Sequence, residues 1–463
     1  MRLAKDIQKS GFFWLPSNPN HKIPGNIKIV DGGAISLEVV GLFDESVEGL
    51  NNALNGKSNI KRIVGNIEKY GFVTLDYCFY SNLNMSFGGI SKSAVHVGRA
   101  ILGVAYDDKE EINISSFRFT TDGLNEWVNL SGISVEHDLS NKSAIIKYTP
   151  LENINIDIND CLQLSIVFEW TLPGFANKIE AKITQKTYLD ITSSCDRPLQ
   201  DFIEIARKIT NFLCFATDKT VCMQDVSFKS KVSDEEEVKT VSSDLFYKSL
   251  PFTETIPKIE AYKLLFRFDQ IKENASVVIN NWLHAYEIIY PSLNLYFSAK
   301  TGGHRYIEGN FLALAQCLET YHRRTSSQKF MDEALFNQLT QSLVSYCPDE
   351  FKEWLTGRLA TGNEITLTQR IKNIIEPYKE IIGSSKNRGK LISSIVKTRN
   401  YLTHYDEKMT LEACEGVKLI NLCFKIEAIF QLHMLQMLGF THPEILSIFK
   451  NSESLKFKIN REI

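Results

Sequence analysis

The sequence lacks the residue patterns that mark common metal, nucleotide and acyl-transfer sites. None of its nine cysteines forms a C-x-x-C pair, and no histidine stands at zinc-finger spacing from a close cysteine pair. Neither a glycine-rich phosphate loop nor a nucleophile elbow occurs. These absences argue against a zinc module, a P-loop enzyme and a serine hydrolase. We expect no cofactor and no metal.

Long apolar runs are also missing. The segment Met1–Asp6 has no apolar core of the kind found in signal peptides. The apolar stretch Leu419–Phe440 is interrupted by Lys425, Glu427 and His433, which indicates a buried or amphipathic helix and not a membrane span. Most cysteines lie in apolar runs and suit small buried thiols in a reducing compartment. We therefore expect a cytoplasmic protein without a membrane partner.

The chain has no surplus of positive charge. Its formal net charge is −3, so the total gives no sign of nucleic-acid binding, and an RNA site would need a local basic patch. With 463 residues, of which 43% are hydrophobic, the chain is long enough for two or three domains with sizeable cores.

Two kinds of pattern divide the chain, and together they predict an α+β protein. Residues 1–230 contain many short strand-like runs separated by turn signals, followed by one helix after Pro198. They predict an antiparallel β-rich domain, either a sandwich or an open barrel, with a closing helix. We expect residues 231–258, with the acidic run Asp234–Glu237, to form an exposed linker with a loop or hairpin tip. Residues 259–463 have helical periodicity from about Glu260 onward and predict an all-α bundle.

One segment of the helical half carries side chains suited to phosphate chemistry. On a helix with about 100° per residue, Arg399, Asn400 and His404 fall within one arc of the surface. Asn400 and His404 stand at i and i+4, so we expect their side chains to meet. Apolar Leu391 and Ile395 occupy another side and can anchor the helix.

These three side chains fit phosphodiester cleavage without a metal. Imidazole titrates near neutral pH and can take or return a proton. A guanidinium can bind a phosphate through two hydrogen bonds and stabilise charge that develops on its oxygens. Asn400 could orient His404 or bind the phosphate or sugar, while RNA supplies its own nucleophile, the 2′-hydroxyl.

The bare spacing of an Arg and a His five residues later is a weak signal. Taken alone, it favours an exposed Arg399 and a His404 that interacts with the dipole at a helix C-terminus. Two features favour the catalytic interpretation: an asparagine directly follows the arginine, and the motif lies in a late helix of an all-helical region.

The same residues resemble the ApeA-like HEPN family. The segment Ile395–Asp406, which reads IVKTRNYLTHYD, is similar to that family's signature, as is Tyr306–Arg323 upstream. The N-terminal half resembles the β-rich leader of the family in the segments Gly11–Pro16, Ile23–Gly25, Gly32–Gly41, Ile63–Gly65, Val73–Asp76 and Asp122–Trp127. The resemblance runs nearly from end to end with its blocks in order.

The resemblance implies a bacterial anti-phage protein with an N-terminal sensor or regulatory domain and a C-terminal HEPN ribonuclease domain. HEPN ribonucleases usually form homodimers in which two such motifs face each other, and they leave a 2′,3′-cyclic phosphate and a 5′-hydroxyl. His404 would be the acid and base, Arg399 the transition-state clamp, and Asn400 an orienting group. Glu319 would match the acidic residue that many HEPN domains bring from an earlier helix. An equally good interpretation makes Glu319 a surface carboxylate paired with Arg323 at i+4.

The expected partners are an RNA substrate, with tRNA as one candidate, a second or further copy of the chain, and a phage-derived trigger. Lys386, Arg388 and Lys390 would form a small basic loop ahead of the motif helix and, with Lys397, steer RNA phosphates, although each alone suits a solvated surface. His322–Arg324 could extend this surface or simply end its helix favourably.

Two other hypotheses remain at this point. The bundle could be a non-catalytic HEPN scaffold that binds RNA or protein, with recognition in the β half. An intact Arg, Asn and His set argues against it, because a decayed site does not need all three. Nucleotide transfer with a partner enzyme is the other, and no nucleotide-binding fingerprint in the chain supports it.

Overall fold

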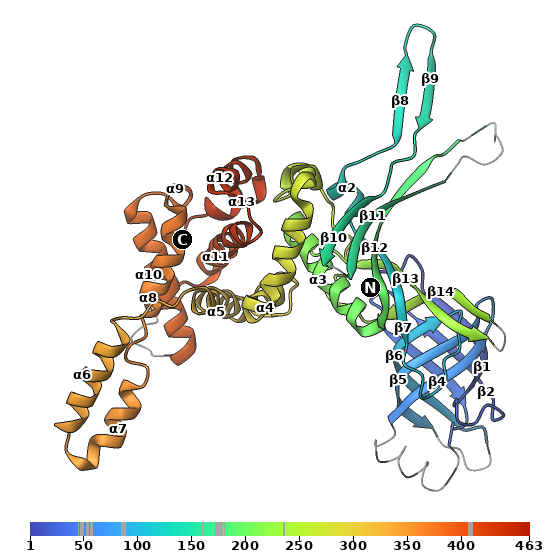
Figure 1. Ribbon diagram of the computed structural model, residues 1–463, viewed down its shortest axis with the longest axis horizontal. Helices are drawn as coiled ribbons and strands as arrows, with labels where there is room; N and C mark the ends of the chain where they lie inside the picture. The colour runs from blue at the N-terminus through green and yellow to red at the C-terminus, as the bar shows by residue number, and fades with distance from the viewer. Residues whose placement is uncertain are drawn as a thin grey trace. The chain divides into compact units, whose positions relative to one another are not determined.

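The computed structural model divides the chain into two compact units, Met1–Ser276 and Val277–Ile463, each considered by itself (Figure 1). The structure describes all residues except 45, 47–50, 52–54, 56–58, 85–88, 160, 172–178, 180, 235–236 and 406–410. The centre of the acidic run and the last residue of the signature, Asp406, therefore lie outside the described residues. None of the described helices has the length and hydropathy needed to cross a membrane.

The first unit begins with a closed six-stranded antiparallel barrel. Its strands are β1 (Ile7–Trp14), β2 (Ile23–Ile29), β3 (Ile35–Val40), β4 (Asn59–Ile67), β5 (Gly71–Asn84) and β6 (Lys92–Leu102). The order is β6-β3-β2-β1-β4-β5, and pairing of β5 with β6 closes the ring. Alternate side chains point inward, among them Phe13, Ile27 and Leu37, and form one apolar core. The barrel is therefore closed, where the sequence allowed a sandwich or an open barrel.

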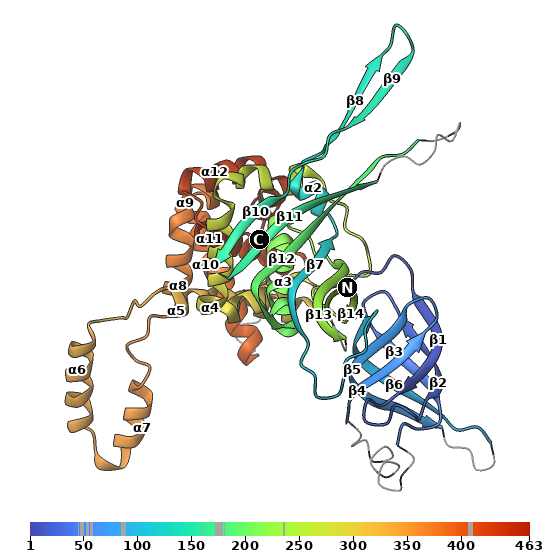
Figure 2. The same cartoon turned by 45° about the vertical axis from the view of Figure 1, so that its right-hand side comes forward.

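A second antiparallel sheet continues from the barrel, because β14 pairs with the end of β6. Its strands are β7 (Asn113–Thr121), β10 (Ile154–Asn159), β11 (Leu162–Thr171), β12 (Thr184–Pro198), β13 (Met223–Asp234) and β14 (Glu237–Tyr247). The helix predicted after Pro198 is α3 (Leu199–Thr217), which packs on β7 and β12. Its Phe202 stacks on Phe117 at 6.5 Å, and its Phe212 meets Trp127 of α2 (Leu124–Val128) at 5.7 Å. The hairpin of β8 (Ile133–Asp138) and β9 (Ser143–Tyr148) extends away from this sheet (Figure 2).

The linker and the helix expected in the middle of the chain were wrong, but the hairpin tip was confirmed. Residues 231–258 contain the end of β13 and all of β14, so most of the predicted linker belongs to the sheet. Asp234 of β13 pairs with Glu237 of β14, which places the turn of this hairpin at the acidic run. Residues 260–274 form the short 3₁₀ turns η1 (Ala261–Lys263), η2 (Phe268–Gln270) and η3 (Lys272–Asn274) in place of a helix. The adjacent residues Leu264, Leu265 and Phe266 are all buried, and the Leu265 amide donates to the Ala216 carbonyl near the end of α3. Burial of three consecutive residues therefore outweighed the helical spacing.

The second unit is an all-α bundle, as the sequence predicts. Its helices are α4 (Ala275–Lys300), α5 (Ile307–Thr325), α6 (Glu333–Ser345), α7 (Asp349–Leu359), α8 (Leu367–Ile375), η4 (Glu376–Tyr378), α9 (Lys379–Ile382), α10 (Ser385–His404), α11 (Gly416–Met437), α12 (His442–Asn451) and α13 (Glu453–Ile459). Helix α11 packs against α5, α10, α12 and α13. Its buried Phe430 lies between Tyr296 at 5.0 Å and Tyr321 at 5.9 Å. Helices α5, α8 and α10 also pack on one another, which brings the motif helix beside α5.

Helices α6 and α7 form a hairpin that extends from the bundle in both views (Figures 1 and 2). Neither of these two fully described helices contains a buried residue. At the base of the hairpin, Lys329 and Glu364 form an isolated β-bridge, and the Phe330 amide donates to the Asn363 carbonyl at 2.8 Å. This bridge places the carboxylate of Glu364 beside the end of α5.

Candidate active site

Helix α10 presents the motif because its opposite side is anchored in the bundle. Leu391, Ile395, Thr398 and Leu402 are all buried, and their spacing of four, three and four residues defines one helix face. The helix ends at His404, and Tyr405 follows in the left-handed conformation with φ of 50°. The other face of the last two turns therefore carries the motif side chains toward solvent.

The Arg399 guanidinium is held by two side chains. Its Nη1 donates to Oδ1 of Asn400 at 3.3 Å, and its Nη2 lies 3.5 Å from Oε2 of Glu319 on α5. The Arg399 side chain is 34% exposed, so part of it remains open to a ligand. His404 is exposed, and none of the described residues forms a hydrogen bond with its ring. The expected contact of Asn400 with His404 is replaced by the contact of Asn400 with Arg399.

Glu319 forms ion pairs with two guanidiniums at once. Its Oε1 accepts from Nε and Nη2 of Arg323 at 3.3 and 3.2 Å, while Oε2 faces Arg399. The side chain is only 17% exposed, so a single half-buried carboxylate sets the spacing of Arg323 and Arg399. The i+4 pair with Arg323 that the sequence allowed is present, and the same carboxylate also contacts the motif helix.

The ion pairs continue beyond Arg323. Its Nη1 donates to Oε2 of Glu364, which also accepts from Nη2 of Arg370 on α8 at 2.6 Å, and Nζ of Lys329 lies 3.7 Å from the other oxygen. We call Arg399, Glu319, Arg323, Glu364, Arg370 and Lys329 the ionic network. Burial alone would raise the pKa of Glu364, but the hydrogen bond and charge of Arg323 outweigh it and hold that pKa below its usual value.

His322 lies behind the network and adds no charge to it at neutral pH. Burial, with the charges of Arg370 and Arg323, lowers the pKa of His322 below its usual value. The Nδ1 atom lies 3.5 Å from Nη1 of Arg370, and Nε2 lies 3.2 Å from the Asn373 amide. Four cations and two carboxylates therefore leave the network with an excess of two positive charges.

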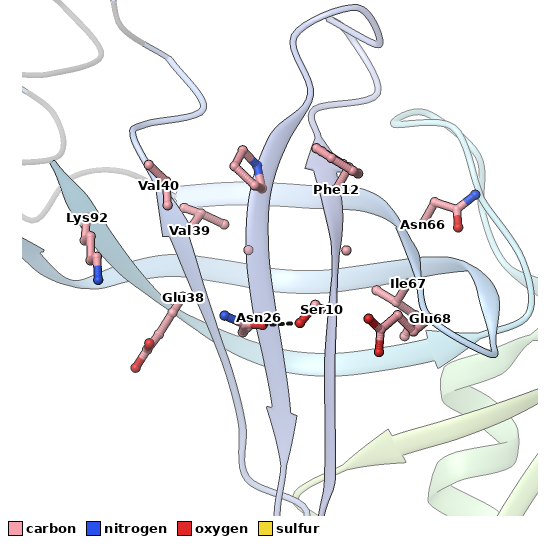
Figure 3. Close-up of a pocket in the computed structure, with 13 residues that line it drawn as sticks. Ser10, Phe12, Asn26, Glu38, Val39, Val40, Asn66, Ile67, Glu68 and Lys92 are labelled. Carbon is pink, nitrogen blue, oxygen red and sulfur yellow. Dashed lines mark hydrogen bonds between the residues drawn. The ribbon is translucent and has the colours of Figure 1, made fainter. Parts of the chain in front are cut away.

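A hollow on the barrel has the opposite electrostatic character. It encloses about 580 Å³ on the outer face, where Ser10 donates to Asn26 at 2.7 Å (Figure 3). Glu38 and Glu68 stand on its two sides, with Lys92 at one edge. Two carboxylates against one ammonium disfavour an RNA backbone. The described part of the helical unit is the better place for RNA chemistry.

Comparison with known proteins decides the family. Two family models match the chain: ApeA N-terminal domain 1 over residues 8–282, more than half of the chain, and Apea-like HEPN over residues 312–444. The chain belongs to the ApeA-like HEPN family. The HEPN match includes Glu319, Arg399, Asn400 and His404, and it makes the helical unit a defence-related module of ribonuclease type. Neither a curated protein nor a solved structure matches the chain.

The four basic residues expected to steer RNA are placed differently in this HEPN unit. Lys386, Arg388 and Lys390 lie in the first two turns of α10 and do not form a loop ahead of it. The spacing of nine residues from Lys390 to Arg399 corresponds to about 14 Å at 1.5 Å per residue. Nη1 of Arg388 donates to the Gly383 carbonyl at 2.7 Å, and Nζ of Lys390 to the Ile463 carbonyl at 2.6 Å. Lys397 pairs with Glu412 at 3.0 Å. None of the four belongs to the ionic network.

Three network residues gave no signal in the sequence. Lys329 and Glu364 come from segments at either end of the α6–α7 hairpin, and Arg370 comes from α8. Only tertiary folding brings these charges beside α5. Arg323 could be expected from the sequence, because it stands one turn after Glu319 and belongs to the segment His322–Arg324 that could extend the basic surface.

Proposed function

We propose that this chain is a metal-independent RNA endonuclease of bacterial anti-phage defence. The observation that carries the proposal is the position of Arg399, which contacts Asn400 and Glu319 and stands five residues before the exposed His404 on one helix. A guanidinium fixed in this way can bind a phosphate without first losing its own conformational freedom. Family membership supports the assignment to RNA and to defence.

In the proposed reaction the nucleophile is a 2′-hydroxyl of the RNA, and it attacks the phosphate bound by Arg399. His404 takes the proton of the 2′-hydroxyl while the 2′-oxygen attacks phosphorus. The bond from phosphorus to the 5′-oxygen breaks, and this oxygen receives a proton from the His404 of a second copy. The products are a 2′,3′-cyclic phosphate and a 5′-hydroxyl, with no water consumed. Arg399 stabilises the charge that develops on the phosphate oxygens.

A site of this kind needs two imidazoles in opposite protonation states, and one chain presents one His404. We therefore propose a homodimer or higher homo-oligomer in which two motifs share a cleft. Because unrestrained cleavage would poison the host, the β-rich unit would act as the sensor or restraint that responds to a phage-derived trigger. RNA, with tRNA as a candidate, is the substrate in this scheme, and Lys386, Arg388, Lys390 and Lys397 would contact it away from the cleavage point.

The first prediction concerns Arg399 and His404. The purified chain, activated with lysate of phage-infected cells where needed, should cut RNA in the presence of EDTA and create new 5′-hydroxyl ends. Arg399→Ala and His404→Ala should each lower cleavage by at least about a hundredfold, since each removes a group that acts in the transition state. End mapping of RNA from infected cells would identify the substrate and check the same loss in vivo.

The controls are exposed residues of the same types. Arg358→Ala on α7 and His284→Ala on α4 should cut as the unaltered protein does. Normal cutting by both motif variants would overturn the site assignment. A protein that binds RNA but yields no new 5′-hydroxyl ends under any of these conditions would instead be the non-catalytic scaffold.

A further inference from the structure

Arg323 is a second exposed guanidinium next to the motif arginine. The guanidiniums of Arg323 and Arg399 both contact the carboxylate of Glu319. The distance between them is therefore limited to the width of this carboxylate plus two ion-pair contacts. Arg323 is on α5 and Arg399 on α10, so packing of these two helices fixes the spacing. Neighbouring phosphates of a nucleic acid strand offer a matching pair of close anions.

Arg323 keeps capacity for another anion. A guanidinium has five N–H donors. Arg323 uses three of them, two toward Glu319 and one toward Glu364. Its side chain is 47% exposed, and two of its donors have none of these carboxylates as a partner.

The charge balance around Arg323 also favours an anion. Glu364 is shared by Arg323, the buried Arg370 and Lys329, so it cannot neutralise Arg323 by itself. Lys329, whose side chain is 49% exposed, lies 3.7 Å from the other carboxylate oxygen of Glu364 and adds a further cation to the network. An arriving phosphate would take up part of the network's excess of two positive charges and would gain charge-assisted hydrogen bonds.

We propose that Arg323, supported by Lys329, binds a second phosphate of the RNA strand, adjacent to the phosphate held by Arg399. Glu319 is the positioning residue that sets the two guanidiniums at the spacing of one strand. The proposal rests on the proposed function and specifies its substrate class: an RNA strand with at least two consecutive phosphodiesters. A dinucleoside monophosphate would fill only the Arg399 position.

Cleavage of three short substrates tests the proposal. Each has a single ribonucleotide r among deoxynucleotides d, so that only one bond can be cut: r-p-d, d-p-r-p-d and r-p-d-p-d. The second has an extra phosphate on the 5′ side of the cut and the third on the 3′ side. The full chain should prefer one of these two over r-p-d. Arg323→Gln should remove this preference, because kcat/KM should fall about tenfold more for that substrate than for r-p-d.

Arg324→Gln is the matched control, since it removes the same charge from the next position, which is also exposed. Arg323→Lys should regain only part of the preference because it keeps the charge and loses the planar fork. Removal of Arg323 leaves Glu319 with Arg399, and Glu364 with Arg370 and Lys329, so we expect the variant to fold. An equal loss on all three substrates would overturn the proposal.

A binding experiment separates this proposal from the proposed function. Fluorescence anisotropy with a labelled RNA hexamer is measured against salt concentration, and it needs no cleavage. Arg323→Gln should reduce the slope of log K against log salt by about 0.7, the value for one phosphate contact on a single strand, and Arg324→Gln should not. A chain that never cuts RNA but shows this change refutes the nuclease and keeps the phosphate site. If the chain cuts RNA but the slope is the same for the unaltered protein and for Arg323→Gln, the nuclease is supported and the second phosphate site is refuted.

Discussion

At the level of single residues, the site depends on a carboxylate whose negative charge would by itself repel the RNA phosphates. Glu319 places a negative charge where RNA phosphates are expected, yet two guanidiniums outnumber it. Without Glu319, Arg399 and Arg323 would repel each other and spread over several rotamers. Glu319 therefore contributes by positioning Arg399, because a guanidinium that is already ordered loses less entropy when the transition state forms.

Glu319→Gln tests this role. The amide keeps the shape of the side chain but removes its charge, so Arg399 should lose its fixed orientation. We expect kcat to fall about tenfold, while RNA affinity stays constant or rises because the site becomes more positive. Cleavage kinetics measure the first quantity and fluorescence anisotropy the second. If kcat is unchanged, Glu319 is only a surface partner of Arg323.

The residue scale also shows where prediction from sequence ends. Arg399, Asn400 and His404 could be found because they stand within one turn and a half of a single helix. Glu364 and Arg370 could not, because they reach Arg323 only after the base of the α6–α7 hairpin and α8 have packed. Ion pairs between distant segments have no local pattern in the sequence.

At the scale of elements, prediction succeeded where one face alone is buried. The spacing of Leu391, Ile395 and Leu402 gave α10, and the structure buries all three. Prediction failed for 260–274, where the sequence has a helical period but the three consecutive residues Leu264–Phe266 are all buried. Barrel closure depends on the pairing of β5 with β6, which a list of separate strands cannot reveal.

Helix α11 carries a buried imidazole whose titration affects stability. Burial lowers the pKa of His433 to about 4, below the usual 6.5, while Nε2 donates to the Ile374 carbonyl at 2.8 Å. Tyr321 of α5 and Tyr378 of η4 pack against the ring, and His322 is the nearby titratable group. Between pH 6.5 and about 4 the unfolded chain therefore binds a proton that the folded chain does not.

Stability of the helical unit should consequently fall as the pH drops through this window. The full effect is about 3 kcal/mol, from 1.36 kcal/mol per pKa unit. Denaturant unfolding followed by circular dichroism at pH 4.5 and 7 should show a smaller pH dependence for His433→Gln than for the unaltered chain, whatever the loss at pH 7. The same substitution at exposed His284 is the control. An unaltered pH dependence in His433→Gln would assign the acid effect to other groups.

At the scale of the whole molecule, the proposed chemistry requires more than one chain. A single chain offers one exposed His404, whereas the proposed reaction needs a base and an acid at the same phosphate. Two-fold symmetry supplies both from one sequence, since a symmetric dimer places the same surface of each copy against the other. The net charge of −3 per chain then conceals a local cluster of positive charge in each copy.

Mixing experiments distinguish a shared site from two independent sites. When equal amounts of unaltered chain and His404→Ala chain assemble at random, about a quarter of the dimers contain two intact chains and about half contain one. If cleavage needs both imidazoles, activity should fall to about a quarter; if each chain acts alone, it should fall only to about half.

Co-expression of the two chains ensures random assembly, and light scattering checks the mass of the assembly. His284→Ala in place of His404→Ala should leave full activity. A result near one half would show that each copy provides its own acid and base, and the partner proton donor would then have to come from within the same chain.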